Sequence, residues 1–381
     1  MYPAVFRRAL VTPVLSILLL AAPLGIHAVF AQDAPAPTRL EVVFVLDTTG
    51  SMDGLIEGAK QKIWSIANTM IDLNPEAEVA FGLVGYRDHG DDYVTRVHAL
   101  TGDVQGIFTK LRRFEAAGGG DTPEAVNEAL SDAVLKIDWG DNVGDSRIIF
   151  LVGDAPPHMD YANGPKYEKV LKNAREKDII VNTVQAGEDL ETESYWRKIA
   201  ELGGGKYMAI PQDGGQIRQI PTPMDAPIIE VQAKIDATIV PYGSKDDVAR
   251  LEEKLSDRKA ASAEVQADNA TFYSKKSGKK EAVTGGGDLV TDLANGDATL
   301  DALPDDQLSD DLKAMTPDAR KVHLEGLLAN RKQLEAEMAK LVKDRDAYIA
   351  AQTATADATP DASFDSSVKS TLKAQLKLSK P

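Results

Sequence analysis

The sequence predicts an α/β fold: a doubly wound, mostly parallel six-stranded sheet with one antiparallel edge strand, followed by a mainly helical C-terminal region. Two observations support this prediction. Between Leu40 and about Ile210, short apolar runs typical of buried strands alternate with segments of helical periodicity. From Ser309 to Ala350 the periodicity is helical throughout, with leucines spaced among Lys, Arg and Glu.

The first half of the sheet is predicted from three apolar runs. The first strand covers Leu40–Leu46, and the helix after it has apolar residues at helical spacing from Leu55 to Met70. The next two strands, Val79–Tyr86 and Tyr93–Leu100, are joined by a short polar turn. Because parallel strands need a long crossover, this short connection favours an antiparallel pair at one edge of the sheet.

The second half of the sheet continues the same alternation of strands and helices. Three further strands are predicted at Ser146–Val152, Ile179–Gln185 and Lys206–Ile210, and helices at about 104–115, 123–137, 165–177 and 192–202. Together these elements define a predicted domain at residues 39–215.

The N-terminal segment is predicted to be a signal peptide at residues 1–31. Arg7 and Arg8 precede an apolar stretch, and Val29-Phe30-Ala31 is typical of a cleavage site before Gln32. We therefore expect an exported protein, periplasmic or secreted, without a stable membrane span after cleavage. An uncleaved membrane anchor is the alternative. Residues 32–38 are a predicted linker.

The chain beyond residue 215 is less regular. Residues 216–305 are predicted to be a linker and a small region in which Ile228–Val240 fits a strand or a helix. Residues 306–350 are predicted to be helical, either packed on their own domain or forming a coiled-coil partner surface. Residues 351–381, rich in Ala, Thr, Asp and Ser, are predicted to be disordered.

Composition narrows the functional classes. The chain has no cysteine, which excludes disulfides and thiolate metal sites. Its formal net charge of -16 disfavours nucleic acid as a partner, since binding to phosphates needs clustered Lys and Arg. Composition does not define the oligomeric state.

Three loops carry oxygen ligands suited to a hard cation. Asp47, Thr49 and Ser51 follow the first strand at alternate positions, and Asp154 follows the strand that ends at Val152. If these strands are neighbours, the two carboxylates face each other at the carboxyl edge of the sheet. Glycines 118–120 would let the loop that holds Thr122 approach the same point. Asp47, Thr49, Ser51, Thr122 and Asp154 are therefore candidate ligands for Mg²⁺, or for Mn²⁺ or Ca²⁺.

These motifs resemble a von Willebrand factor type A (VWA) domain with a metal-ion-dependent adhesion site (MIDAS). The resemblance covers roughly residues 38–215. Asp47, Thr49 and Ser51 fit the family's Asp-x-Ser/Thr-x-Ser motif, Thr122 its separate threonine and Asp154 its second aspartate. The surrounding phrases, such as Gly-Asp-Ala-Pro-Pro-His, resemble bacterial exported, kinase-associated and hemicentin-like members. The resemblance implies Mg²⁺-dependent, non-catalytic binding of a ligand or protein.

Residues near the predicted metal ligands suggest a ligand-binding rim and, as an alternative to binding, a hydrolytic site. Asp88, His89, Asp121 and His158 are candidate residues of a ligand-binding rim. Together with Ser51 and Asp154, His158 also provides the three residue types of a Ser/His/Asp catalytic triad. However, Ser51 cannot serve as a nucleophile while it ligates a metal ion. We therefore predict a binding protein and no enzyme, with a metal-assisted hydrolase as a minor alternative.

The predicted function is that of an exported, metal-dependent binding module. The cation would capture an acidic side chain on a protein partner, which supplies the last ligand. The principal alternative is a non-catalytic component of an envelope assembly that binds mainly through its C-terminal helices.

Overall fold

The computed structural model describes residues 39–120, 122–215, 220–276, 286–355 and 363–376, which lie in one compact unit. The predicted signal peptide at 1–31, the linker at 32–38 and Asp121 lie outside the described residues. None of the helices in these ranges combines the length and the hydropathy that crossing a bilayer requires.

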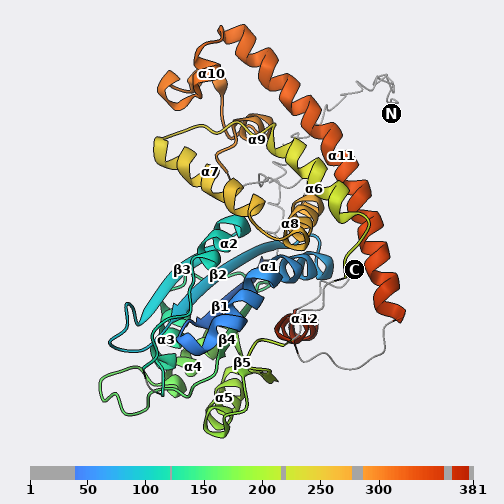
Figure 1. Ribbon diagram of the computed structural model, residues 1–381. Coiled ribbons are helices and arrows are strands. Elements are labelled where there is room, and N and C mark those ends of the chain that lie inside the picture. The colour runs from blue at the N-terminus through green and yellow to red at the C-terminus, as the bar shows by residue number, and fades with distance from the viewer. Residues whose placement is uncertain (1–38, 121, 216–219, 277–285, 356–362, 377–381) are drawn as a thin grey trace, which may run out of the picture. The chain divides into compact units, whose positions relative to one another are not determined.

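A six-stranded sheet forms the centre of the first half of the chain (Figure 1). Its order is β3-β2-β1-β4-β5-β6, with β2 and β3 antiparallel and the other neighbours parallel. The predicted fold class and the antiparallel edge are confirmed. The strands are β1 (Arg39–Asp47), β2 (Glu78–Tyr86), β3 (Thr95–Thr101), β4 (Ser146–Gly153), β5 (Ile179–Ala186) and β6 (Gly204–Ile210).

Helices cover both faces of the sheet because β1 is apolar on both sides. Val42, Phe44 and Leu46 belong to one core cluster, whereas Val43 and Val45 belong to the other. The helices on the first face are α1 (Asp53–Leu73), α2 (Val104–Arg112), α8 (Ala263–Lys276) and α12 (Phe364–Gln375). Those on the second face are α3 (Val126–Leu135), α4 (Tyr167–Glu176) and α5 (Leu190–Gly203).

The remaining helices pack in the region that follows β6. They are α6 (Asp225–Asp236), α7 (Lys245–Lys259), α9 (Leu289–Asn295), α10 (Asp310–Lys313) and α11 (Pro317–Thr355), with the short 3₁₀ turns η2 (Leu300–Ala302) and η3 (Asp305–Gln307). A further 3₁₀ turn, η1 (Gly50–Met52), lies between β1 and α1. The undecided segment Ile228–Val240 is mostly helix α6, whose Ile228, Val231 and Ile235 share a core cluster with α8 and α11. Residues 220–276 are thus packed helices for the most part, where we expected a linker and an uncertain region.

Buried ion pairs fasten α11 to its neighbours. Arg331 is 2% exposed and pairs with Asp288, while its Nε donates to the Thr238 hydroxyl at 2.7 Å. Arg345 pairs with Asp225 and Asp268, each at 2.8 Å. Each arginine satisfies several acceptors, which a buried charge requires. The α11 helix is therefore packed within its own chain along much of its length.

The predicted disorder of residues 351–381 is wrong for the part that the structure describes. Helix α12 buries Phe364, Val368, Leu372 and Leu376 in the core that contains α1. These residues recur every fourth position and form one apolar stripe. The polar composition between them concealed this stripe in the sequence.

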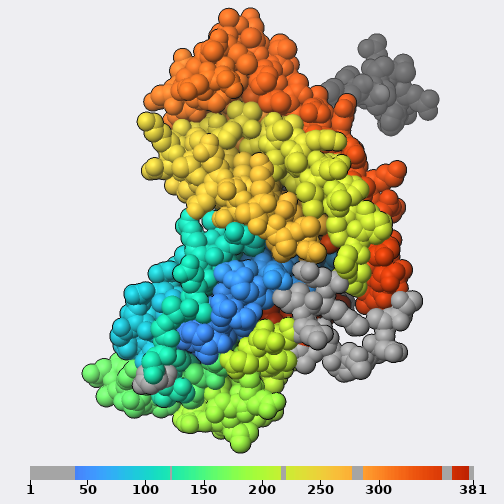
Figure 2. All heavy atoms as spheres, in the orientation of Figure 1, coloured from blue at the N-terminus to red at the C-terminus, as the bar shows by residue number. Residues whose placement is uncertain are grey.

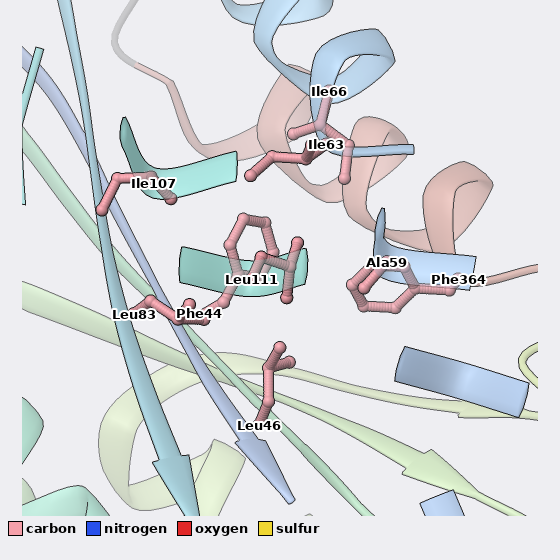
Figure 3. Close-up of a pocket in the computed structure, with 9 residues that line it drawn as sticks. All are labelled: Phe44, Leu46, Ala59, Ile63, Ile66, Leu83, Ile107, Leu111 and Phe364. Atoms are coloured by element: carbon pink, nitrogen blue, oxygen red, sulfur yellow. The ribbon is translucent and has the colours of Figure 1, made fainter. Parts of the chain in front are cut away.

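Phe364 reaches the face of the sheet itself. Its ring lies 6.1 Å from that of Phe44 on β1, and the gap left among the lining residues is only about 10 Å³. Figure 3 shows Phe364 beside Ala59 of α1, among side chains from β1, β2 and α2. The last described helix thus completes the core of the first domain.

Candidate metal centre

The candidate site lies where the strand order reverses. The adjacent parallel strands β1 and β4 pair Leu46 with Val152, so the loops that begin at Asp47 and Asp154 leave the same edge of the sheet. In open α/β sheets, ligands bind in the crevice at this point. The prediction required β1 and β4 to be neighbours, and they are.

Three predicted ligands lie together in the loop after β1. The Asp47 carboxylate is fully buried, and its Oδ1 accepts hydrogen bonds from the Thr49 amide at 2.9 Å and the Thr49 hydroxyl at 2.6 Å. The Thr49 hydroxyl lies 3.4 Å from that of Ser51. Thr49 is buried and Ser51 is exposed, so the row of oxygens runs from the end of the sheet to solvent.

Backbone contacts bring the glycine-rich loop against this row. The Gly50 amide donates to the Gly118 carbonyl at 3.2 Å, and the Ala117 amide donates to the Thr48 carbonyl at 3.1 Å. Gly119 has a positive φ of 71°, and a Cβ placed on it would lie 2.9 Å from the Cβ of Thr49. The expected close approach of this loop is therefore present, and it requires glycine at position 119.

The buried Arg87 fixes the two loops to each other. Its Nε donates to the Thr48 carbonyl at 3.2 Å, and its Nη2 donates to the Glu115 carbonyl at 2.9 Å. The Ala125 amide in turn donates to the Arg87 carbonyl at 3.1 Å. The guanidinium group of Arg87 thus holds the backbone in place on both sides of the site.

Asp154 is held from two directions. Its backbone carbonyl accepts from the Thr192 hydroxyl at 3.1 Å, which ties the loop after β4 to α5. Its Oδ2 accepts from the Gln212 side-chain amide at 2.6 Å, and the same amide donates to the Ser51 carbonyl at 3.3 Å. Gln212 was not predicted, because no motif links the loop after β6 to the other ligands in the sequence.

Thr122 is placed less tightly than the other predicted ligands. It is exposed, and within the described ranges no hydrogen bond joins it to Asp47, Thr49, Ser51 or Asp154. Contacts among the described residues therefore bring together four of the five predicted ligands, and Thr122 is an exposed residue of the neighbouring glycine-rich loop.

Glu124 is a buried acid that the sequence analysis missed. It is 3% exposed, its Oε2 has no hydrogen-bond partner among the described residues, and its Oε1 lies beside Gly119. Burial and the nearby charges of Asp47, Asp88, Asp91 and Asp154 raise its pKa to about 9. Because the predicted helix at about 123–137 includes Glu124 in its first turn, Glu124 was not considered as a residue of the site.

Asp47 shows the same electrostatic pattern. Burial, together with the charge of Asp154, raises its pKa to about 7, although the two hydrogen bonds from Thr49 oppose this increase. Within the residues described, its buried Oδ2 has no hydrogen bond of standard geometry, although the nearby Tyr86 hydroxyl interacts with the carboxylate and also lowers its pKa. Such an oxygen is costly in an apolar interior unless a cation or donor satisfies it.

The donor set at the β1–β4 crevice fits a hard divalent cation. It offers the carboxylates of Asp47 and Asp154 with the hydroxyls of Thr49 and Ser51, all oxygen ligands. Elsewhere in the described chain, as here, no three acidic or histidine side chains converge as a metal-binding group. A cation at this point would therefore depend on the hydroxyls as well as the carboxylates.

Three of the predicted rim residues, Asp88, His89 and His158, form a separate cluster beside the crevice. The buried His158 has its Nε2 3.4 Å from Oδ2 of Asp88 and its Nδ1 2.7 Å from Oδ1 of Asp160. Its ring stacks on Tyr161 at 4.0 Å, and the His89 ring meets Tyr161 edge-on at 4.6 Å. His158 is thus held by its hydrogen bond to Asp160 and by stacking on Tyr161, while its Nε2 lies near Asp88, and no hydrogen bond in the described part of the chain joins it to Ser51.

Residues 41–212 match the model of the von Willebrand factor A domain family. These residues form a VWA domain. The chain is 25% identical over 171 residues to inter-alpha-trypsin inhibitor heavy chain H2 of Sus scrofa, covering 42% of this chain and 17% of that protein. It is 35% identical over 114 residues to von Willebrand factor A domain-containing protein 7 of Rattus norvegicus, and this match covers 30% of this chain and 12% of that protein.

The likeness to these proteins is confined to part of each. The chain spans less than a fifth of the length of the curated relatives it matches. Among solved structures, the VWA domain of SpRpn10 is 17% identical with a TM-score of 0.35, covering 46% of this chain and 89% of that one. VWA domains are generally protein-interaction modules, which is the functional class of residues 41–212.

Proposed function

We propose that the VWA domain binds a protein partner through a divalent cation held at the β1–β4 crevice. Asp47, Thr49, Ser51 and Asp154 would hold Mg²⁺, or Mn²⁺ or Ca²⁺, with Thr122 closing the site from the glycine-rich loop. The observation that carries this proposal is the buried Oδ2 of Asp47, which makes no hydrogen bond of standard geometry with the described residues and lies in a crevice rich in carboxylates. The bound cation would supply an open position for an acidic side chain on the partner.

Each residue at the proposed metal site would have a different role in binding the cation. Asp47 lies deepest, with Thr49 fixing the orientation of its carboxylate. The Gln212 amide orients the Asp154 carboxylate from the opposite side, as outer residues commonly do for metal ligands. Ser51 is exposed at the solvent end of the row, where a partner could approach. Glu124 adds a further buried carboxyl group to the crevice, and its raised pKa of about 9 keeps it protonated near neutral pH.

We also propose that the protein binds its partner without turning it over and that it acts after export. Support for binding comes from His158, which is paired with Asp88 and Asp160 and so is not oriented toward Ser51 as a general base. Support for export comes from the N-terminal sequence, in which arginines precede an apolar stretch and a small-residue cleavage pattern.

Calorimetric titration of Mg²⁺, Mn²⁺ and Ca²⁺ into the full chain would test the metal site. We expect saturable binding at one site, lost in Asp47→Asn, because that change removes the deepest carboxylate. Asp53→Asn is the matched control, since Asp53 is an exposed acid in the first turn of α1. Absence of binding to the unmodified chain, or equal binding by Asp47→Asn, would refute the proposal.

A further inference from the structure

A groove of about 470 Å³ lies between α9, the η2 turn and the first half of α11. Its floor is apolar, and the side chains that form it include Val290, Leu293, Leu300, Leu324 and Leu328. Residues Pro317 and Leu328 mark its ends along α11, so it follows that helix for about 16 Å at the usual rise per residue. Figures 1 and 2 show these elements in orange, with α10 and the start of α11 at the molecular surface.

The groove is fixed in shape by the elements beneath it. Val290 and Leu324 are 1% and 4% exposed and belong to one core cluster. The Tyr242 hydroxyl donates to Asp292 of α9 at 2.8 Å, and the buried Arg331 of α11 pairs with Asp288 at the start of α9. Both walls are therefore anchored to each other, and a ligand would meet a preformed surface.

The rim of the groove is acidic. Asp301, Asp318 and Glu325 line it, with Lys321 as the basic lining residue. Residues 296–330 contain eight acidic and three basic side chains. Two of those basic side chains are committed to neighbours, since Lys313 pairs with Asp310 and Arg320 with Asp305. The surroundings of the apolar floor are consequently negative.

We propose that this groove docks a basic amphipathic helix of a partner protein. An apolar stripe of such a helix would lie on the leucine floor, and its flanking Lys or Arg residues would face the acidic rim. Helix α12 has this composition within the chain, but its apolar stripe is already buried against α1 and the sheet. The inference is independent of the metal site.

Fluorescence anisotropy with the full chain would test this docking. The probe is a labelled peptide of about 18 residues, with Leu and Lys at helical spacing so that one face is apolar. We expect binding to weaken about tenfold in the double variant Asp301→Lys/Glu325→Lys, since both rim charges are reversed. We expect it to be lost in Ala294→Trp, because Ala294 is an exposed groove residue and the indole would fill the space.

The matched control is Glu337→Lys/Asp344→Lys, which makes the same charge change at exposed positions of α11 outside the groove. This pair should bind the peptide like the unmodified chain. Equal weakening in both pairs would show attraction to overall charge alone and would overturn the proposal, as would absence of binding. A concentration-dependent dimer in sedimentation that Ala294→Trp abolishes would assign the groove to a second copy instead.

Discussion

Asp47 and Glu124 are buried in the same crevice, and burial raises the pKa of each well above its ordinary value. A carboxyl with a raised pKa holds its proton more strongly in the folded than in the unfolded chain. The stabilisation this gives is present below the ordinary pKa and is lost as pH rises through the folded value. For Glu124 that window extends from about 4.5 to about 9.

Glu124→Gln should therefore change the pH dependence of stability in metal-free buffer. Between pH 6 and 9 the unmodified chain should lose free energy of unfolding relative to the variant, by at most about 1.4 kcal/mol per pH unit. Urea denaturation with EDTA at several pH values would measure this difference. Glu188→Gln, an exposed loop position, is the control and should follow the unmodified chain. Parallel curves for Glu124→Gln and the unmodified chain would contradict the raised pKa.

Some residues of the candidate metal site could be predicted from the sequence, and others could not. Asp47, Thr49 and Ser51 are contiguous, and Asp154 follows a recognisable strand, so their type and order predicted a shared site. Glu124 and Gln212 act through tertiary contacts, with Gly119 and with Asp154 respectively. Neither residue belongs to a local pattern that marks it, because proximity across loops leaves no periodicity in a sequence.

Among the elements, α12 contributes more to the VWA domain than its distance in sequence suggests. Lys369 of α12 donates to the Ser65 hydroxyl of α1 at 2.7 Å, and the Gln375 side chain exchanges hydrogen bonds with Asn182 of β5. The Phe364 amide donates to the Gly214 carbonyl at 3.1 Å, in the same loop as Gln212. The helix is thus fixed at both ends by polar contacts and along its length by the apolar stripe.

Phe364→Ala should lower the free energy of unfolding by about 3 to 5 kcal/mol, the usual cost of deleting a buried aromatic ring. The residue is 4% exposed and contacts a core with almost no spare volume. Chemical denaturation of the full chain would measure the loss. Lys373→Ala on the exposed side of the same helix should shift stability by less than about 0.5 kcal/mol. Similar effects of the two changes would contradict this packing.

The strands were easier to predict from the sequence than helices α6 and α12, and the reason is the pattern of apolar residues in each. Strands β1, β2, β4 and β5 are buried on both faces and form continuous apolar runs, and all six predicted strands were located with every end within two residues of the observed one. Helix α6 was ambiguous because Ile228–Val240 mixes apolar and β-branched residues. For α12, the apolar residues are only every fourth position in a polar segment, so composition indicated disorder where the tertiary core stabilises a helix.

At the scale of the whole molecule, helices α8 and α12 share one hydrophobic core with the VWA domain, whereas α6, α9 and α11 contribute to two further clusters. Trp64 of α1 contacts Phe272 of α8 with ring centroids 5.4 Å apart, and Phe108 of α2 at 5.8 Å. Helix α8 is joined in turn to α11, since Asp268 pairs with Arg345. No separate core divides the VWA domain from α8 and α12 in the described chain.

We accordingly expect the full chain to unfold in one cooperative transition. Tryptophan fluorescence, which reports on Trp64, Trp139 and Trp196 of the VWA domain, and far-UV circular dichroism, which reports on all helices, should give the same urea midpoint. An earlier loss of the dichroism signal would contradict this expectation, because it would show that the C-terminal helices unfold while the sheet persists.

Closure of the core by α12 has a consequence for how the protein is made. Synthesis proceeds from the N-terminus, and N-terminal domains commonly fold before the rest of a chain is complete. Here the face of the sheet around Phe44 lacks its cover until residues 364–376 have been synthesised. The VWA domain therefore finishes folding only after residues 364–376 have been synthesised. A premature stop codon that removed this short segment would leave every candidate metal ligand in place and still expose the interior of the domain that carries them.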